Sequence, residues 1–326
     1  MDAITRQGLI TGFACLFATL IAIAANLDQP YWAAITAYMV ANVDPSALAT
    51  KAVLRVAGTV AGCILGYVLA IATEGFPVLQ ALVMFMAAAV GTYWRFRSRY
   101  SYAWILGAVS ILMLIATSIT EPTELHDFAW YRFYEILTGV VVATLLSFAF
   151  TPLAHLRLEP VAVTVSHDVA RHQALSAGLS IVLIAWLWAL FNLPSLLQVM
   201  ITSLVIVSAD IVGTRLRGLQ RIMGCILGGC LGLLVIIIDA ANFWWWAFAL
   251  TAGIFLMSRL HLSPHPHAYV GTQAGLAFLV TLINGSGPPD SIEAPINRLT
   301  GIVIGVAIMT FVSWVMSARL RPAAAA

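Results

Sequence analysis

The chain consists mainly of long apolar runs that carry few charged side chains and follow one another with short polar breaks. Of its 326 residues, 61% are hydrophobic and only 9% are charged, whereas a soluble domain has about 25% charged residues. A transmembrane helix needs about 20 mainly apolar residues. The pattern therefore indicates a polytopic membrane protein without a large catalytic domain outside the membrane.

Polar, proline and glycine positions separate twelve apolar segments. We predict an all-α polytopic membrane protein with about 12 transmembrane helices, at residues 7–25, 30–43, 53–73, 76–94, 102–119, 132–150, 173–191, 194–209, 219–238, 242–258, 268–284 and 297–317. Only 15 residues lie between Asp28 and Asp44, and as a helix they measure about 22 Å against about 30 Å of hydrocarbon. The apolar segment between His267 and Asn284 is also short for a transmembrane helix. We therefore expect several helices to be short, broken or re-entrant.

An internal repeat divides the chain into two halves. A shift of 166 residues places Gly12 on Gly178, Asn26 on Asn192, Asp44 on Asp210, Arg55 on Arg221 and Arg132 on Arg298. This offset predicts two six-helix membrane repeats, residues 1–151 and 173–326, the second ending in a short cytoplasmic tail. A cytoplasmic linker at 152–172 would join them. Because each repeat has an even number of spans, the two are expected to be parallel.

The basic residues predict the orientation of the chain in the membrane. With the N-terminus in the cytoplasm, all but two of the 16 Lys and Arg residues fall on the cytoplasmic side. By the positive-inside rule, both termini are then cytoplasmic. The two exceptions, Arg132 and Arg298, each follow an acidic outer loop and open the last span of their half.

Arg132 and Arg298 are the first candidates for substrate binding. A guanidinium group offers a planar fork to a carboxylate and keeps its charge. The alternative is an interfacial arginine paired with a local acid, because Glu135 lies one turn after Arg132, whereas Gly301 takes the equivalent place after Arg298. An intramembrane carboxylate often marks a proton path, so Glu135 is the candidate proton-coupling residue.

The remaining predicted substrate-binding residues are Asn26, Asn192, Tyr31 and Trp32. Each asparagine precedes a proline and a short apolar segment. A helix interrupted at membrane depth must face protein or a water-lined cavity, and its free N-terminal N–H groups favour an anion. For Tyr31 and Trp32, aromatic anchors at the outer membrane interface are the alternative.

The predicted inner gate, or anion entrance, consists of Arg55, Arg221, Asp44 and Asp210. The alternatives are snorkelling of the two arginines to lipid phosphate, and helix caps or counter-ions for the two aspartates. Small residues recur every four positions after each arginine, at Gly58, Gly62 and Gly66 and at Gly224, Gly228 and Gly232. They indicate close helix packing, with a central seam between the halves as the functional alternative.

We predict no metal site, no cofactor and no nucleic-acid partner. His261, His265 and His267 are interrupted by two prolines and have no cysteine nearby, which does not fit the usual ligand spacing of a zinc site. The chain has no phosphate-binding loop of the form GxxxxGK[ST]. A net charge of +2 gives no indication of nucleic-acid binding.

Three stretches carry a family resemblance: residues 29–40 (QPYWAAITAYMV), 51–62 (KAVLRVAGTVAG) and 215–224 (RLRGLQRIMG). They resemble the signature of the FUSC family, the fusaric acid resistance proteins and aromatic carboxylic acid exporters of bacterial inner membranes. The resemblance covers nearly the whole chain. The family is similar, more distantly, to plant aluminium-activated malate transporters, in which an arginine near the start of the last span is thought to line an anion pore. That role would fall on Arg132 and Arg298.

The resemblance also bears on partners. Many family members have a sizeable soluble cytoplasmic domain, whereas only the short predicted linker is present here. A periplasmic adaptor protein is therefore an open question, as is a homodimer. The lipid bilayer and a small organic anion are the other expected partners.

The leading hypothesis is a transporter that exports organic, in particular aromatic, carboxylate anions and is driven by the proton gradient. A passive anion channel resembling the plant malate channels would share the two arginines but would need no titratable partner. A membrane-embedded enzyme acting on lipid is disfavoured, because no nucleophile or metal constellation is recognisable in the sequence.

Overall fold

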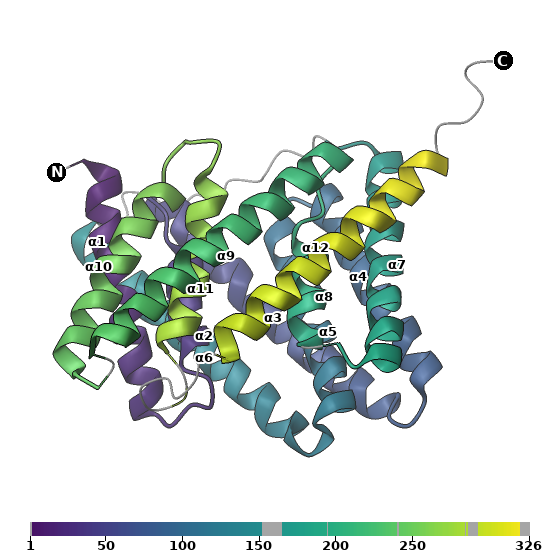
Figure 1. Ribbon diagram of the computed structural model, residues 1–326, viewed down its shortest axis with the longest axis horizontal. Helices are drawn as coiled ribbons and strands as arrows, with labels where there is room; N and C mark the ends of the chain where they lie inside the picture. The colour runs from purple at the N-terminus through teal and green to yellow at the C-terminus, as the bar shows by residue number, and fades with distance from the viewer. Residues whose placement is uncertain are drawn as a thin grey trace. The chain divides into compact units, whose positions relative to one another are not determined.

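The computed structural model describes residues 2–151, 165–193, 195–239, 241–283, 285 and 293–319, and all regular structure in them is helical. Much of the predicted linker, residues 152–164, lies outside this part. The helices are α1 (Ala3–Ala24), α2 (Tyr31–Val40), α3 (Pro45–Ala72), α4 (Pro77–Arg97), α5 (Ser101–Thr120), the 3-10 helix η1 (Pro122–Glu124), α6 (Leu125–Phe150), α7 (His167–Phe191), α8 (Leu196–Val205), α9 (Ile211–Asp239), α10 (Phe243–His261), α11 (Ala268–Leu282) and α12 (Glu293–Arg319) (Figure 1).

The twelve α-helices correspond one to one with the twelve predicted apolar segments. Among the described residues, nine helices are long and apolar enough to cross a membrane. The expectation of short helices is confirmed for α2, with 10 residues, and for α11, with 15 residues. The helix α8 also has only 10 residues, although its apolar run predicted a longer one. How many helices cross the bilayer stays a prediction.

Local sequence signals explain where the helices begin and end. Asp2 caps α1 by accepting a hydrogen bond from the Thr5 N–H at 2.9 Å, and Asn242 does the same for the first turn of α10. Asn26 and Asn192 follow α1 and α7 with φ angles of 52° and 48°. Asparagine tolerates this left-handed conformation, which commonly ends a helix.

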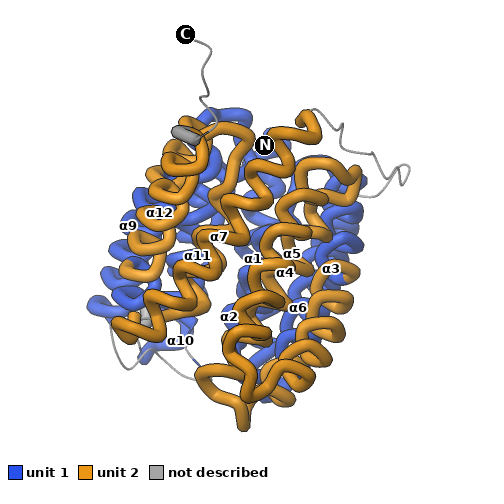
Figure 2. The backbone as a smooth tube through the Cα atoms, turned by 90° about the vertical axis from the view of Figure 1, so that its right-hand side faces the viewer, with its two compact units in different colours: residues 1–56, 130–159, 220–299 blue, residues 57–129, 160–219, 300–326 orange. Residues whose placement is uncertain are grey.

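The chain forms two compact units that do not coincide with the two sequence halves (Figure 2). Unit 1 comprises residues 1–56, 130–159 and 220–299, and unit 2 comprises residues 57–129, 160–219 and 300–326. Each unit therefore draws helices from both halves. The four long helices α3, α6, α9 and α12 contribute residues to both units.

In unit 1, α1 lies beside α10 and α2, and α11 packs against α10 and α2. The Trp246 indole N–H donates to the Leu282 carbonyl at 2.9 Å, which joins the start of α10 to the end of α11. Buried alanines such as Ala18, Ala22 and Ala33 form much of the core. Small side chains allow the helix backbones to approach closely, as is usual inside membranes.

Unit 2 is built in the same manner from the other helices. The helix α4 packs against α7 and α5, and α8 packs against α7 and α5. Gly12 of unit 1 faces Thr251, and Gly178 of unit 2 faces Phe85. These two contacts are equivalent under the 166-residue shift, which relates Gly12 to Gly178 and Phe85 to Thr251. Helix bounds in the second half follow those of the first at nearly the same offset.

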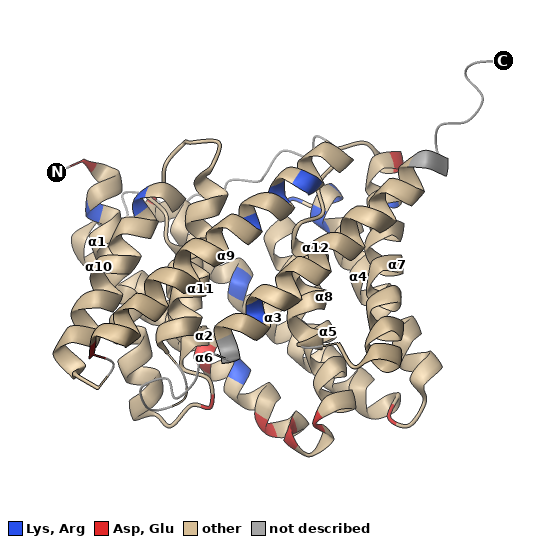
Figure 3. Cartoon of the chain, viewed as in Figure 1, with Lys and Arg blue, Asp and Glu red and all other residues tan. Residues whose placement is uncertain are grey.

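In unit 2, basic residues lie at one end of the helices and most acidic residues at the other (Figure 3), with Asp168 in the first turn of α7 at the basic end. Arg95 and Arg97 occupy the last turn of α4, and Arg95 donates to the Leu204 carbonyl at the end of α8. The acidic residues Glu124 and Asp127 lie where α6 begins. This segregation follows the charge bias seen in the sequence.

The glycine rows of α3 and α9 pack against neighbouring helices of their own sequence half. A Cβ atom at Gly58 or Gly62 would overlap α5, and one at Gly224 or Gly228 would overlap α11. Helix packing, rather than a seam between the halves, is therefore the role that these contacts show.

Two adjacent glycines of α9 provide a matched test of this packing. A Cβ at Gly228 would overlap the Ala274 backbone, whereas one at Gly229 meets nothing within 4 Å. We expect Gly228→Ala to destabilise the protein by about 1–3 kcal/mol, as overpacking does, and Gly229→Ala to be neutral or slightly stabilising. Thermal unfolding in detergent measures both, and equal melting temperatures would contradict the close α9–α11 packing.

Candidate functional site

The candidate site lies in unit 1, where α2 begins. Gln29 precedes the helix, and its side-chain oxygen accepts hydrogen bonds from the Tyr31 hydroxyl and, at 2.9 Å, from the Trp32 indole N–H. The two aromatic rings are 5.3 Å apart, and both side chains are half-buried. They are therefore fixed by the protein rather than placed as free anchors at a membrane surface.

Helix α6 adds an arginine and a carboxylate to these aromatic residues. The guanidinium carbon of Arg132 lies 3.5 Å from the centroid of the Trp32 ring, a close cation–π contact. Glu135 is one turn further along α6, is 2% exposed, and accepts a hydrogen bond from the Gln29 backbone N–H at 2.7 Å. Gln29 thus joins the carboxylate to the ring that contacts Arg132.

The second predicted arginine comes from α12. Arg298 is half-buried and hydrogen-bonds the Cys225 sulfur of α9. Arg298 interacts electrostatically with the Tyr31 side chain, which also interacts with Arg132 and Glu135. Both arginines and Glu135 therefore lie within electrostatic range of the Tyr31 side chain, as does Asp28.

Arg55 and Arg221 do not extend toward the membrane surface, as snorkelling would require. Both are only 3% exposed and turn into unit 1. Arg55 donates to the Thr36 hydroxyl of α2 at 3.1 Å, and Arg221 donates to the Gln273 side-chain oxygen of α11 at 2.8 Å. Snorkelling to lipid phosphate is therefore wrong for both, because their polar partners lie inside the helix bundle.

The two aspartates of the predicted inner gate cap long helices. Asp44 accepts hydrogen bonds from the backbone N–H groups of Ser46 and Ala47 at the start of α3. Asp210 accepts one from the Gly213 N–H at the start of α9. The alternative of helix capping is confirmed, and a role in gating stays a prediction.

Asn26 and Asn192 are exposed, and the contacts shown for them are those of residues that end helices. Asn26 lies in unit 1, a few residues before Gln29, whereas Asn192 lies in unit 2. Their contribution to a substrate cavity stays a prediction.

Sequence reasoning missed three neutral residues that hold the site residues in place. Gln29 binds Tyr31 and Trp32, Thr36 accepts from Arg55, and Gln273 accepts from Arg221. A polar residue within an apolar segment is the signal that could have pointed to Thr36 and Gln273. The backbone contact of Gln29 has no such signal.

The buried charges of the described residues are unbalanced. The fully buried charged side chains among them are Arg55, Arg132, Arg221 and Glu135, three cations and one anion. All four belong to unit 1. Buried charge of one sign is costly in a membrane, so this arrangement is suited to receive a further negative charge.

Comparison with known proteins identifies the family. A model described as the fusaric acid resistance protein family matches residues 8–169, and one described as fusaric acid resistance protein-like matches residues 179–312. The chain belongs to the fusaric acid resistance protein family. The family resemblance seen in the sequence is thereby confirmed.

Curated relatives in this family include p-hydroxybenzoic acid efflux pump subunits AaeB. The subunit of Escherichia coli O157:H7 is 34% identical over 169 residues, which cover 47% of this chain and 26% of the relative. That of Escherichia fergusonii is 34% identical over 138 residues, 39% of this chain and 21% of the relative. The chain thus spans about a quarter of these relatives' length. No solved structure matches it.

The Arg221–Gln273 contact of this family member can be tested by stability. In Gln273→Leu, a buried guanidinium loses its 2.8 Å acceptor, and we expect a loss of about 2 kcal/mol in unfolding free energy. Gln273→Glu keeps an acceptor oxygen and should retain stability. Thermal unfolding in detergent compares the variants, and a Gln273→Leu protein as stable as wild type would contradict the importance of the contact.

Proposed function

We propose that the chain is a membrane transporter that exports organic, in particular aromatic, carboxylate anions, and that Glu135 couples binding of the anion to a proton. The observation that carries this function is the meeting of Arg132, Arg298 and Glu135 around Tyr31 in unit 1. The family and the p-hydroxybenzoic acid efflux pump relatives support the substrate class.

The substrate carboxylate would bind to the two guanidinium groups. Arginine suits this role, because its planar fork pairs with both oxygens of a carboxylate and stays charged. The fully buried side chains among the described residues of unit 1 carry three positive charges against one negative charge. A bound organic anion reduces this excess. The Tyr31 and Trp32 rings lie beside the arginines and would contact the aromatic body of the substrate.

Glu135 and the substrate compete for the same positive charge. As a carboxylate, Glu135 lies within electrostatic range of Arg132 and accepts the Gln29 N–H. Protonation removes its negative charge, so the positive charge of Arg132 attracts another anion more strongly. Proton binding therefore favours anion binding.

The two sequence halves contribute unequally to this site. At the 166-residue offset, Glu135 corresponds to Gly301 and Tyr31 corresponds to Leu197. The second half supplies Arg298 but no equivalent carboxylate or tyrosine. One proton-coupled site in each chain is the arrangement that these differences support.

The membrane organisation is proposed as two parallel six-helix repeats with both termini in the cytoplasm of a bacterial inner membrane. Gly139 faces Ala33 and Thr36, and Gly305 faces Val199 and Thr202, so these contacts recur at an offset of 166. A periplasmic adaptor is a proposed partner, because the relatives are described as subunits of an efflux pump. A homodimer is a second proposed assembly.

Replacing the arginines tests the site. We expect Arg298→Ala and Arg132→Ala to weaken binding of p-hydroxybenzoate by about 10- to 100-fold, the usual loss for a charge-assisted hydrogen bond. Arg132→Lys should be intermediate, because it keeps the charge and loses the fork. Binding to the purified full chain is measured by calorimetry, and export by counterflow in liposomes.

The matched control is Arg259→Ala, because Arg259 is an exposed arginine at the end of α10 in the same unit. It should bind as the wild type does. Size-exclusion profiles identify variants that fail to fold. A folded Arg298→Ala protein with wild-type affinity and flux would overturn the assignment of Arg298.

Glu135→Gln tests proton coupling, because the amide imitates the protonated acid. The wild type should bind p-hydroxybenzoate more tightly as the pH falls from 8 to 6, a range in which the ligand stays ionised. The variant should bind tightly at every pH in this range. Flux that is indifferent to an imposed pH gradient in both proteins, and follows only the anion gradient and the voltage, would indicate a passive channel instead.

A further inference from the structure

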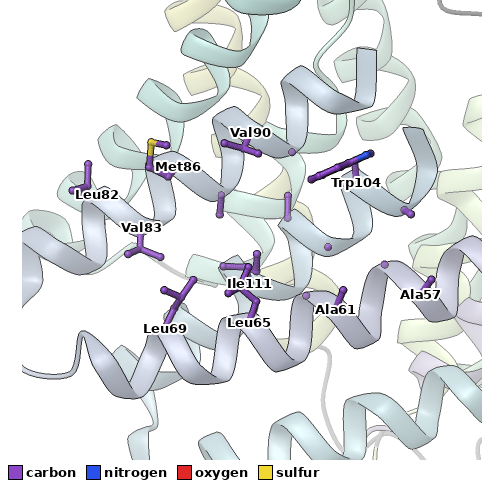
Figure 4. Close-up of a pocket in the computed structure, with 17 residues that line it drawn as sticks. Ala57, Ala61, Leu65, Leu69, Leu82, Val83, Met86, Val90, Trp104 and Ile111 are labelled. Atoms are coloured by element: carbon purple, nitrogen blue, oxygen red, sulfur yellow. The ribbon is translucent and has the colours of Figure 1, made fainter. Parts of the chain in front are cut away.

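A groove in unit 2 is lined by none of the residues of the candidate site. It has a volume of about 540 Å³ and is formed by α3, α4 and α5 (Figure 4). Of the 17 side chains that line it, only Trp104 has an N–H or O–H group. An organic anion would find no cation in this lining, so the groove is suited to an apolar ligand.

The dimensions of the groove fit one hydrocarbon chain. Along α3 the lining extends from Ala57 to Leu69, about 18 Å at 1.5 Å per residue. This is close to one leaflet of a hydrocarbon core about 30 Å thick. The length of the lining is therefore the dimension that matches one acyl chain.

The small residues at the base of the groove are already engaged. A Cβ at Gly58 or Gly62 would overlap the backbone of α5, so this face of α3 is not open for a further helix. The walls carry side chains that are about half exposed, with Leu65 at 50%, Leu82 at 54% and Met86 at 49%. These walls can contact a flexible chain lying between them.

One end of the groove carries the features of a membrane interface. Figure 4 shows Trp104 at the same end as Ala57 and Val90. Trp104 stacks on Trp94 with ring centroids 5.6 Å apart. Tryptophan is enriched at the level of the lipid headgroups. This end therefore lies where a lipid would place its headgroup.

A cation is present at this end. Arg99 lies in the short connection between α4 and α5, is exposed, and has its guanidinium carbon 4.9 Å from the Tyr100 ring centroid. Its neighbour Arg97 is bound to the Val165 carbonyl. Within the described residues, no hydrogen bond or ion pair is shown for Arg99. Basic side chains at a membrane surface attract anionic lipids.

We propose that the groove between α3, α4 and α5 binds one acyl chain of an anionic phospholipid, with the lipid phosphate against Arg99. The apolar lining, the length of about one leaflet and the cation at one end each match one part of such a molecule. Under the proposed topology this end faces the cytoplasm, where the leaflet carries anionic headgroups. This lipid would be independent of the anion site in unit 1.

Native mass spectrometry of the delipidated full chain tests the lipid site, with phosphatidylglycerol and phosphatidylcholine as probes. The wild-type protein should bind one added phosphatidylglycerol molecule. Ala61→Trp places a ring inside the groove and should weaken that binding at least about tenfold. The matched control is Ile64→Trp on the same helix, outside the lining and 64% exposed, which should bind as wild type does.

Charge reversal tests the headgroup. Arg99→Glu should weaken phosphatidylglycerol binding and leave the weaker phosphatidylcholine binding unchanged, whereas Arg171→Glu, at another exposed arginine of unit 2, should change neither. If Ala61→Trp does not fold, Met86→Trp blocks the opposite wall. Equal lipid binding by Ala61→Trp and Ile64→Trp would overturn the proposal. A groove variant that changes only the oligomeric state would instead assign the groove to a second copy of the chain.

Discussion

Buried positive charge around the start of α2 is the constraint on which the site in unit 1 depends. Arg55, Arg132 and Arg221 are all inside the helix packing, where an unsolvated charge is costly. Each is held by a specific partner: a hydroxyl, an aromatic face and an amide oxygen. These contacts tie α3, α6 and α9 to the two short helices α2 and α11. The residues that make the site electropositive are therefore also the residues that hold its helices together.

Close packing of small residues makes such burial possible. Glycine and alanine at the contacts of α3 with α5, and of α9 with α11, bring the helix backbones together, and Arg221 of α9 reaches across the second of these contacts to Gln273. Membrane helices gain little from the hydrophobic effect once they are inserted, and their association rests on packing and polar contacts. The glycine rows and the buried arginines thus both contribute to the association of the helices.

The sequence predicts the helices well and the site only in part. Apolar segments place all twelve helices, because hydrocarbon demands long runs of apolar residues. Several long helices begin earlier than predicted. The first two turns of α3, for example, contain the polar residues Ser46 and Lys51, and in the sequence such a stretch resembles a loop. Whether Arg55 snorkels or turns inward depends on its rotational position around α3, which hydropathy does not report. Gln29 acts through its backbone N–H, which carries no residue signature at all.

The interleaving of the two halves has a consequence for how the protein is made. In unit 1, α1 and α2 pack against α10 and α11, and in unit 2, α4 and α5 pack against α7 and α8. The ribosome delivers α1 to the membrane long before its partner α10 has been synthesised. The first six helices must therefore wait in the bilayer with their packing faces open to lipid. The helices α4, α5, α7 and α8 of unit 2 have all been synthesised before α10. They can therefore pack together first, and the helices of unit 1 pack last.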